Sequence, residues 1–111
     1  MRLRFDDAAI VELNDAALWY EGKQAGLGAE FLEAVLQRAA TLAADPIGGP
    51  VPGVSHDVPA RRVLMGRFPF AIVLVVAEDE VRVIAIAHGK LQPLQVVLRT
   101  RCVSLNLLES L

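Results

Sequence analysis

Three arginines mark the part of this chain whose side chains could bind an anion. Arg61 and Arg62 stand together at the start of one apolar run, and Arg67 separates that run from the next. A guanidinium presents a planar fork of N–H donors that fits a phosphate or a carboxylate. The pattern predicts a β-hairpin with cations at its end, which could contact phosphate or an acidic partner. Alternatively, the arginines keep a sheet edge soluble and discourage edge pairing.

His88 and Lys90 are the next candidates, because they follow the last apolar run of the same half of the chain. Histidine can both give and take a proton near neutral pH, and Lys90 would add a charge beside it. Cleavage of RNA needs a base, a cation at the phosphate and an acid. The catalytic residues stay unassigned, with Arg61, Arg67 and His88 as candidates. In the alternative, His88 only holds the turn that follows it through a backbone hydrogen bond.

Trp19 is the candidate for contact with a partner protein. Trp19 and Tyr20 are adjacent, so they face different directions on a helix. Tyr20 continues the apolar stripe and is predicted to lie in the core, whereas Trp19 lies off that stripe. An exposed tryptophan is a typical anchor of an interface. Packing of Trp19 beneath a loop is the alternative.

No cofactor and no metal is predicted. The sequence has no metal-ligand spacing, and Gly26-Leu27-Gly28 shapes a helix connection rather than a phosphate cradle. The single cysteine, Cys102, cannot form an internal disulfide, and His56 is expected to face solvent. The first residues lack the apolar segment of a signal peptide, and no run approaches the roughly 18 apolar residues of a membrane span. The chain is therefore predicted to be cytoplasmic.

The net charge of −2 conceals an asymmetry between the two halves. Residues 1–60 carry four basic and nine acidic side chains, a net charge of −5, whereas residues 61–111 carry seven basic and four acidic ones, a net charge of +3. A basic face could meet phosphate or an acidic partner. The alternative is that two oppositely charged halves simply solvate one domain.

The elements that must position these side chains follow from periodicity. Residues 1–5 alternate as a strand does, and residues 7–44 read as two amphipathic helices joined through a glycine-bearing break. Two apolar stripes are predicted to face the core: Ile10, Leu13, Ala17 and Tyr20 in the first helix, and Leu27, Phe31, Leu32, Val35, Leu36, Ala39 and Leu42 in the second.

The second half of the chain predicts a sheet. Prolines and glycines make residues 45–60 a loop, and residues 61–88 hold three strands, at about 62–65, 70–77 and 81–87. Residues 89–111 form a tail to which no element is assigned. The 111 residues form one domain of the order β-α-α-β-β-β. Helices first and antiparallel strands after predict an α+β fold, with the helix hairpin packed on one face of a small sheet.

The chain resembles the RelE/ParE superfamily of bacterial type II toxins, also called plasmid-stabilisation proteins. The resemblance covers roughly residues 3–93 and implies the same β-α-α-β-β-β fold. Five short segments in the right order carry it: Ala17-Leu18-Trp19-Tyr20-Glu21, Gly26-Leu27-Gly28-Ala29-Glu30-Phe31-Leu32, Arg61-Arg62-Val63-Leu64, Arg67-Phe68-Pro69-Phe70 and Val83-Ile84-Ala85-Ile86-Ala87-His88.

The resemblance implies a toxin that is neutralised by an antitoxin encoded beside it. RelE-like members cut mRNA on the ribosome, whereas ParE-like members inhibit DNA gyrase. The segments Trp19-Tyr20-Glu21 and Arg67-Phe68-Pro69-Phe70 look more like the ParE side. This predicts a growth inhibitor that acts by binding rather than by catalysis. Its target-binding residues would be Arg61, Arg62, Arg67, His88 and Lys90.

The tail departs from the family pattern, which continues after His88 as Arg-x-Pro-x-Tyr-Trp. Pro93 is retained, but Leu91, Gln95 and Val96 stand in place of the arginine, tyrosine and tryptophan. A catalytic site that relies on a C-terminal tyrosine cannot be built from this sequence. Two alternatives stay open: a RelE-like, ribosome-dependent mRNA endonuclease, and a degenerate toxin that only binds its antitoxin.

Overall fold

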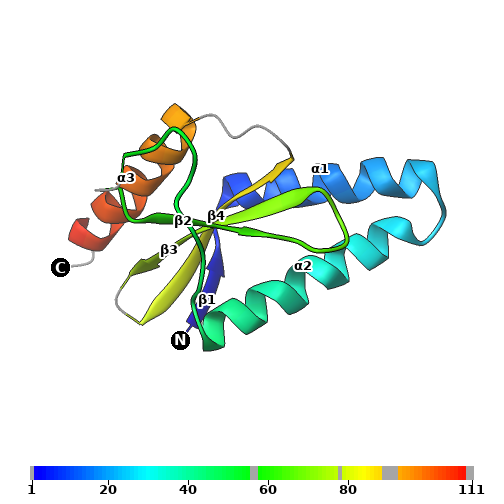
Figure 1. The fold of residues 1–111 in the computed structure, drawn as a ribbon, viewed down its shortest axis with the longest axis horizontal. Helices are drawn as coiled ribbons and strands as arrows, with labels where there is room; N and C mark the ends of the chain where they lie inside the picture. The colour runs from blue at the N-terminus through cyan, green and yellow to red at the C-terminus, as the bar shows by residue number, and fades with distance from the viewer. Residues whose placement is uncertain (1, 56–57, 78, 89–92, 110–111) are drawn as a thin grey trace.

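The computed structural model describes residues 2–55, 58–77, 79–88 and 93–109, with side chains as far as residue 101. Three helices and a four-stranded sheet follow one another along the chain (Figure 1). Their bounds are β1 (Arg2–Phe5), α1 (Asp7–Lys23), α2 (Leu27–Ala44), β2 (Ala60–Leu64), β3 (Phe70–Ala77), β4 (Glu80–His88) and α3 (Pro93–Glu109). The predicted α+β class and element order are confirmed, with α3 added after the last strand.

The sheet has the order β1-β4-β3-β2, in which β1 runs parallel to β4 and the other pairs are antiparallel. Strands β3 and β4 are buried along most of their length because they occupy the two central positions. The register between them shifts at Val73 and Leu74, which leaves Ile84 without an opposite residue. This β-bulge bends β4 at Ile84, directly after Val83, which pairs with the last residue of β1.

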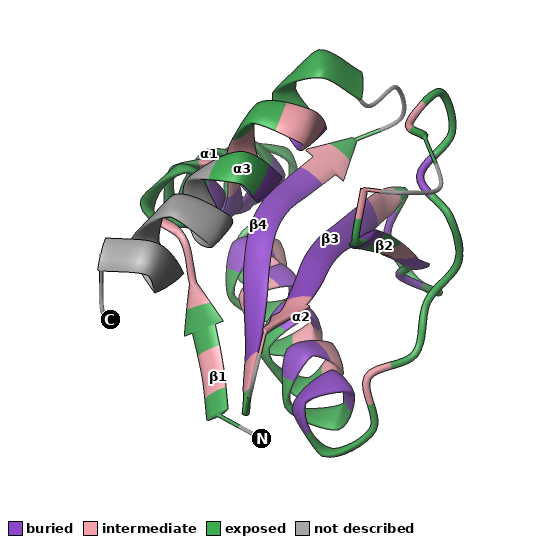
Figure 2. Cartoon of the chain, turned by 90° about the vertical axis from the view of Figure 1, so that its left-hand side faces the viewer, coloured by how far each residue is buried: buried purple, intermediate pink, exposed green. Residues whose placement is uncertain are grey.

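The two faces of the sheet bury different sets of side chains. Helices α1 and α2 cover one face and α3 lies against the other (Figure 1). The core beneath the helix pair contains the aromatic rings of Tyr20, Phe31 and Phe68 together with aliphatic residues of every strand. The core beneath α3 is smaller and aliphatic: Val51, Ala60, Val73, Val75, Ile84, Ala85 and Val96. Figure 2 shows the buried central strands between these layers.

Two residues that the apolar stripes placed in the core lie at the surface. Ile10 is 41% exposed and Leu36 is 51% exposed, so both predictions are wrong. In α1 the buried face passes through Ala9 rather than Ile10, because small alanines let the helix approach the sheet closely. In α2 the neighbouring Val35 occupies the buried position instead of Leu36. The prediction of Tyr20 as a core residue is consistent with its 8% exposure.

The joint between α1 and α2 is held by one carboxylate and two glycines. The Glu21 carboxylate accepts hydrogen bonds from the backbone N–H groups of Gly26, at 2.9 Å, and Gly28, at 3.0 Å. It thereby satisfies donors that the start of α2 leaves free. A Cβ at Gly28 would stand 2.5 Å from the carbonyl oxygen of Ala17, so the helices cross too closely for any side chain here.

Helix α3 occupies part of the tail to which the sequence assigned no element. Val96 is buried in the aliphatic core, while Leu94 and Leu98 point outward and are exposed. Arg99 donates hydrogen bonds to the Glu12 carboxylate, at 2.9 Å, and to the carbonyl of the bulged Ile84, at 3.1 Å. Helix α3 is therefore attached to the rest of the fold by the buried Val96 side chain and by the hydrogen bonds of Arg99. In the described part of the chain, no helix is long and apolar enough to cross a membrane.

Candidate functional site

The arginines at the predicted hairpin do not form one cluster. Arg61 donates a hydrogen bond to the carbonyl of Pro46, at 2.9 Å, just beyond the end of α2. Arg67 donates to Glu30 in the first turn of α2, at 3.2 Å, and its guanidinium lies 5.1 Å from the Phe68 ring centre. Each guanidinium thus already has an acceptor, one in the first turn of α2 and one in the loop just after that helix.

The two anchor points lie at opposite ends of α2. That helix has 18 residues and is therefore about 27 Å long. The guanidinium groups of Arg61 and Arg67 are then separated by a distance on the order of 20 Å. A single phosphate cannot contact both, because a hydrogen bond spans about 3 Å. The candidate catalytic set of Arg61, Arg67 and His88 is not brought together around one atom.

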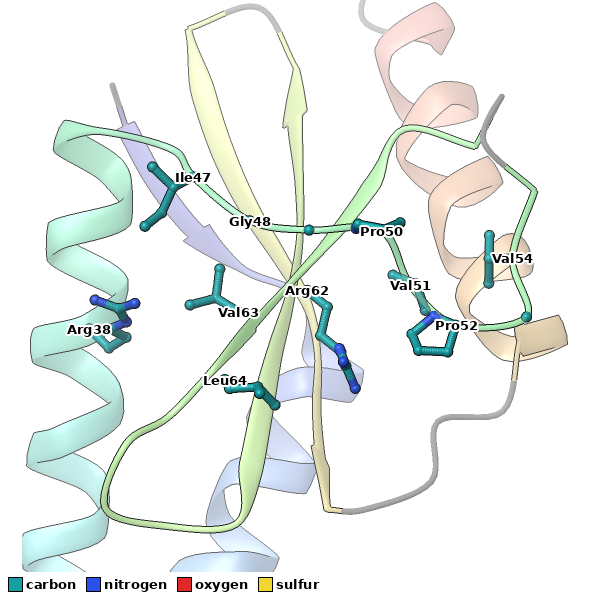
Figure 3. Close-up of a pocket in the computed structure, with 12 residues that line it drawn as sticks. Arg38, Ile47, Gly48, Pro50, Val51, Pro52, Val54, Arg62, Val63 and Leu64 are labelled. Atoms are coloured by element: carbon teal, nitrogen blue, oxygen red, sulfur yellow. The ribbon is translucent and has the colours of Figure 1, made fainter.

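Arg62 instead lines a groove along the outer edge of β2, with a volume of about 770 Å³ (Figure 3). Arg38 of α2 lines the same groove, and the two arginines lie on opposite sides of β2 (Figure 3). Neither guanidinium has a hydrogen bond or an ion pair to another described residue. Exposed Ile47 and Leu64 add apolar surface at the rim. The groove thus offers two available cations beside apolar side chains.

The loop that precedes β2 closes part of its edge. The backbones of Gly49 and Arg62 exchange two hydrogen bonds, at 3.0 and 2.9 Å, and form an isolated antiparallel bridge. Gly48 reaches this position with a φ of +142°, and a Cβ there would stand 3.0 Å from the Cβ of Arg61. Glycine is required because the loop passes so close to the strand. The bridge positions the Arg62 backbone, and its side chain remains free to contact a ligand.

Trp19 and His88, which the sequence assigned to different contacts, lie in one cleft. The cleft has a volume of about 520 Å³ and lies between α1 and the ends of β3 and β4. His88 is exposed and its ring lies tilted against that of Phe70, with ring centres 4.9 Å apart. Trp19 is 59% exposed, so packing beneath the loop is excluded. His88 is therefore associated with the helix pair and not with the free arginine Arg62.

The remaining candidates separate into buried and undescribed residues. Arg82 is buried and forms an ion pair with Asp6 at 2.5 Å. Burial raises the pKa of the Tyr20 phenol above its ordinary value, so this side chain loses its proton only in more alkaline solution than a free tyrosine does. Lys90 and His56 lie outside the described residues. Among the described side chains, no group of three or more possible metal ligands comes together.

Two residues of the groove and the cleft, Arg38 and Asp15, were not predicted from the sequence as site residues. Arg38 appeared only as a polar residue off the apolar stripe of the second helix, and its proximity to β2 depends on the packing of that helix. Asp15 lines the cleft with Trp19. The spacing of four residues between them places both on one face of a helix, which was a usable signal.

Comparison with solved structures identifies the fold. A chain of the chromosomal ParDE TA system from P. aeruginosa matches with a TM-score of 0.64 and 19% identity, over 81% of this chain and 97% of the other. A chain of the intact E. coli RelBE toxin–antitoxin complex matches with a TM-score of 0.57 and 15% identity, over 81% and 98%. No protein-family model and no curated protein matches the sequence. The chain has the RelE/ParE fold.

Proposed function

We propose that this chain is the toxin of a type II toxin–antitoxin module, ParE-like in its action. It would inhibit bacterial growth by binding a cytoplasmic target such as DNA gyrase, and a cognate antitoxin would neutralise it. The observation that carries the proposal is the extent of the structural match. Nearly the whole length of chains from two toxin–antitoxin complexes, 97% and 98%, superposes on this fold.

The geometry of the charged side chains supports binding rather than catalysis. Arg61 and Arg67 are bonded to opposite ends of α2, and the exposed His88 lies in a cleft with Trp19. A nuclease site of the RelE type would need an acid–base group beside a free cation. The groove of Arg38 and Arg62 provides free cations, and the described residues that line it include no histidine or tyrosine. Such a surface can bind a carboxylate or phosphate without transferring a proton.

Within this proposal, the target-binding surface centres on Arg62, with Arg38 as its new companion. Arg61 and Arg67 would contribute at the two ends of the same hairpin, provided that the target displaces Pro46 or Glu30 as the acceptor. His88 and Lys90 remain sequence-based candidates for the target contact. Trp19 is assigned to the partner protein.

A supercoiling assay with purified protein tests the target. The expected result is inhibition of gyrase supercoiling while ribosome-bound mRNA stays intact. An Arg62→Ala variant should inhibit about tenfold less, because truncating a central interface arginine commonly costs more than 1 kcal/mol. Arg4→Ala is the matched control, since Arg4 is also a strand arginine but lies on β1 at the other edge of the sheet.

The two alternatives give different outcomes in the same experiments. Cleavage of ribosome-bound mRNA without an effect on gyrase would identify a RelE-like endonuclease, for which the RelBE match is the supporting observation. Unchanged host growth when the chain is overproduced without an antitoxin would identify the inactive toxin. Either outcome replaces the ParE-like proposal.

A further inference from the structure

The cleft between α1 and the end of the sheet is built from one helical flank and one sheet corner. Glu12, Asp15, Ala16 and Trp19 follow one another at the spacing i, i+3, i+4, i+7, so they form a continuous face of α1. The opposite wall consists of Phe70, Ile86 and His88. The cleft opens here because β1 pairs with β4 only as far as Val83.

The two carboxylates of the cleft, Glu12 and Asp15, differ in whether other residues bind them. Glu12 accepts hydrogen bonds from Arg99, at 2.9 Å, and from the backbone N–H of Ile86, at 3.2 Å. Its charge is therefore already compensated within the fold. Asp15 is exposed and has no hydrogen bond or ion pair to any other residue that the structure describes. Among the described residues of the cleft, Asp15 is therefore the carboxylate without a cationic partner.

An aromatic platform stands beside this charge. Trp19 contacts Tyr20 edge to face, with ring centres 5.0 Å apart, and most of its surface remains in solvent. The Lys23 ammonium already lies 4.9 Å from the centre of the Trp19 ring. Because indole is the best cation–π partner among the side chains, this ring attracts positive charge. Phe70 and His88 supply two further rings on the other wall, inclined to each other by 57°.

We propose that this cleft binds an arginine side chain of a partner protein. A guanidinium can stack on an aromatic face while its N–H donors reach a carboxylate, which an ammonium does less well. The unpaired Asp15 carboxylate favours a cationic protein side chain and opposes a phosphate at this surface. The inference rests on the proposed function only for the identity of that partner, which would be the antitoxin.

The single tryptophan of the chain makes the cleft directly observable. Trp19 fluorescence is titrated with acetyl-Gly-Arg-Gly-amide, and with the same peptide carrying glutamine or glutamate in place of arginine. The expected result is a saturable change with the arginine peptide alone, at millimolar concentration, as befits one side chain. An Asp15→Asn variant should bind about tenfold more weakly. The matched control is Asp45→Asn, an exposed aspartate just past α2 and outside the cleft.

Trp19→Leu removes the fluorescent side chain, so binding of the arginine peptide to this variant is measured by calorimetric titration. Binding should again be about tenfold weaker than in wild type, because the aromatic ring is lost. The proposal is overturned if the glutamine peptide gives the same response as the arginine peptide, or if Asp15→Asn binds as wild type does. Binding of guanosine monophosphate in place of the arginine peptide would also overturn it in favour of a nucleic acid. Circular dichroism establishes that each variant is folded. These titrations need neither gyrase nor an antitoxin, so they succeed or fail independently of the proposed toxicity.

Discussion

The two faces of the sheet are covered by elements of unequal number and packing. On the helix-pair face, α1 and α2 bury a set of touching aromatic rings, in which Tyr20, Phe31 and Phe68 contact one another with ring centres 5.0–5.1 Å apart. On the α3 face, one helix and a proline- and glycine-rich loop cover a small aliphatic core. Because local stability follows buried apolar contact, the α3 face should open at a lower free energy than the helix-pair face.

The largest expected effect distinguishes these two cores directly. Phe31 is fully buried, and Phe31→Ala should lower the free energy of unfolding by about 3–5 kcal/mol, because it leaves a cavity among the rings. Val96→Ala on the α3 face removes a smaller side chain and should cost about 1–2 kcal/mol. Urea denaturation of both variants measures the difference. Equal losses would show that the two faces contribute alike.

The next effect concerns the joint within the helix pair. Gly28→Ala should lower the free energy of unfolding by about 1–3 kcal/mol, since the new Cβ would stand 2.5 Å from the backbone oxygen of Ala17. Gly22→Ala is the control, because nothing lies within 4 Å of its Cβ and alanine is the better helix former. The control should be neutral or stabilising by up to about 1 kcal/mol. Thermal denaturation of the pair checks this, and similar melting temperatures would refute the close crossing.

A smaller effect tests whether α3 can loosen alone. Arg99→Gln removes the ion pair with Glu12, which is partly exposed, so the expected cost is about 1 kcal/mol. Backbone hydrogen exchange should accelerate in α3 while it stays unchanged in α1 and α2. Arg101→Gln, an exposed arginine of the same helix, is the control. Equal acceleration in all three helices would mean that the two faces unfold as one unit.

The smallest effect comes from the phenol on the helix-pair face. Because burial raises the pKa of Tyr20 in the folded chain, the unfolded chain loses this proton first as the pH rises. The folded state then binds more protons, so stability should decline above about pH 10. Tyr20→Phe should show less of this decline. Tyrosinate absorbance follows the titration without interference, since Tyr20 is the sole tyrosine, and an unshifted titration would contradict the assignment.

The helix-pair face was predictable from the sequence because its signals are local. The 3.6-residue periodicity located both helices, and the apolar run at 70–77 predicted a strand with the bounds of β3. The miss at Ile10 has a physical reason. Hydrophobicity favours isoleucine over the adjacent Ala9, but close packing against the sheet selected the smaller side chain. Periodicity alone does not predict that Ala9 is buried and Ile10 is exposed.

The α3 face and the sites were less predictable because their contacts are distant in the sequence. Arg99 reaches Glu12 across 87 positions, and nothing in residues 93–109 alone indicates that contact. Arg61 and Arg67 were expected to act together, since they are close in sequence. The acceptors that separate them, Pro46 and Glu30, belong to another element. The proximity of Trp19 and His88 likewise arises only when α1 packs on β4.

The parallel pairing of β1 with β4 sets the order in which the chain can assemble on the ribosome. Asp6 and its buried partner Arg82 are 76 residues apart, whereas α1 and α2 are neighbours. At translation rates of 5–20 residues per second, β1 waits roughly 4–15 s before its partner strand has been synthesised. The helix pair can form during that interval, but the sheet cannot close. The nascent chain therefore presents an unpaired first strand until β4 has been synthesised.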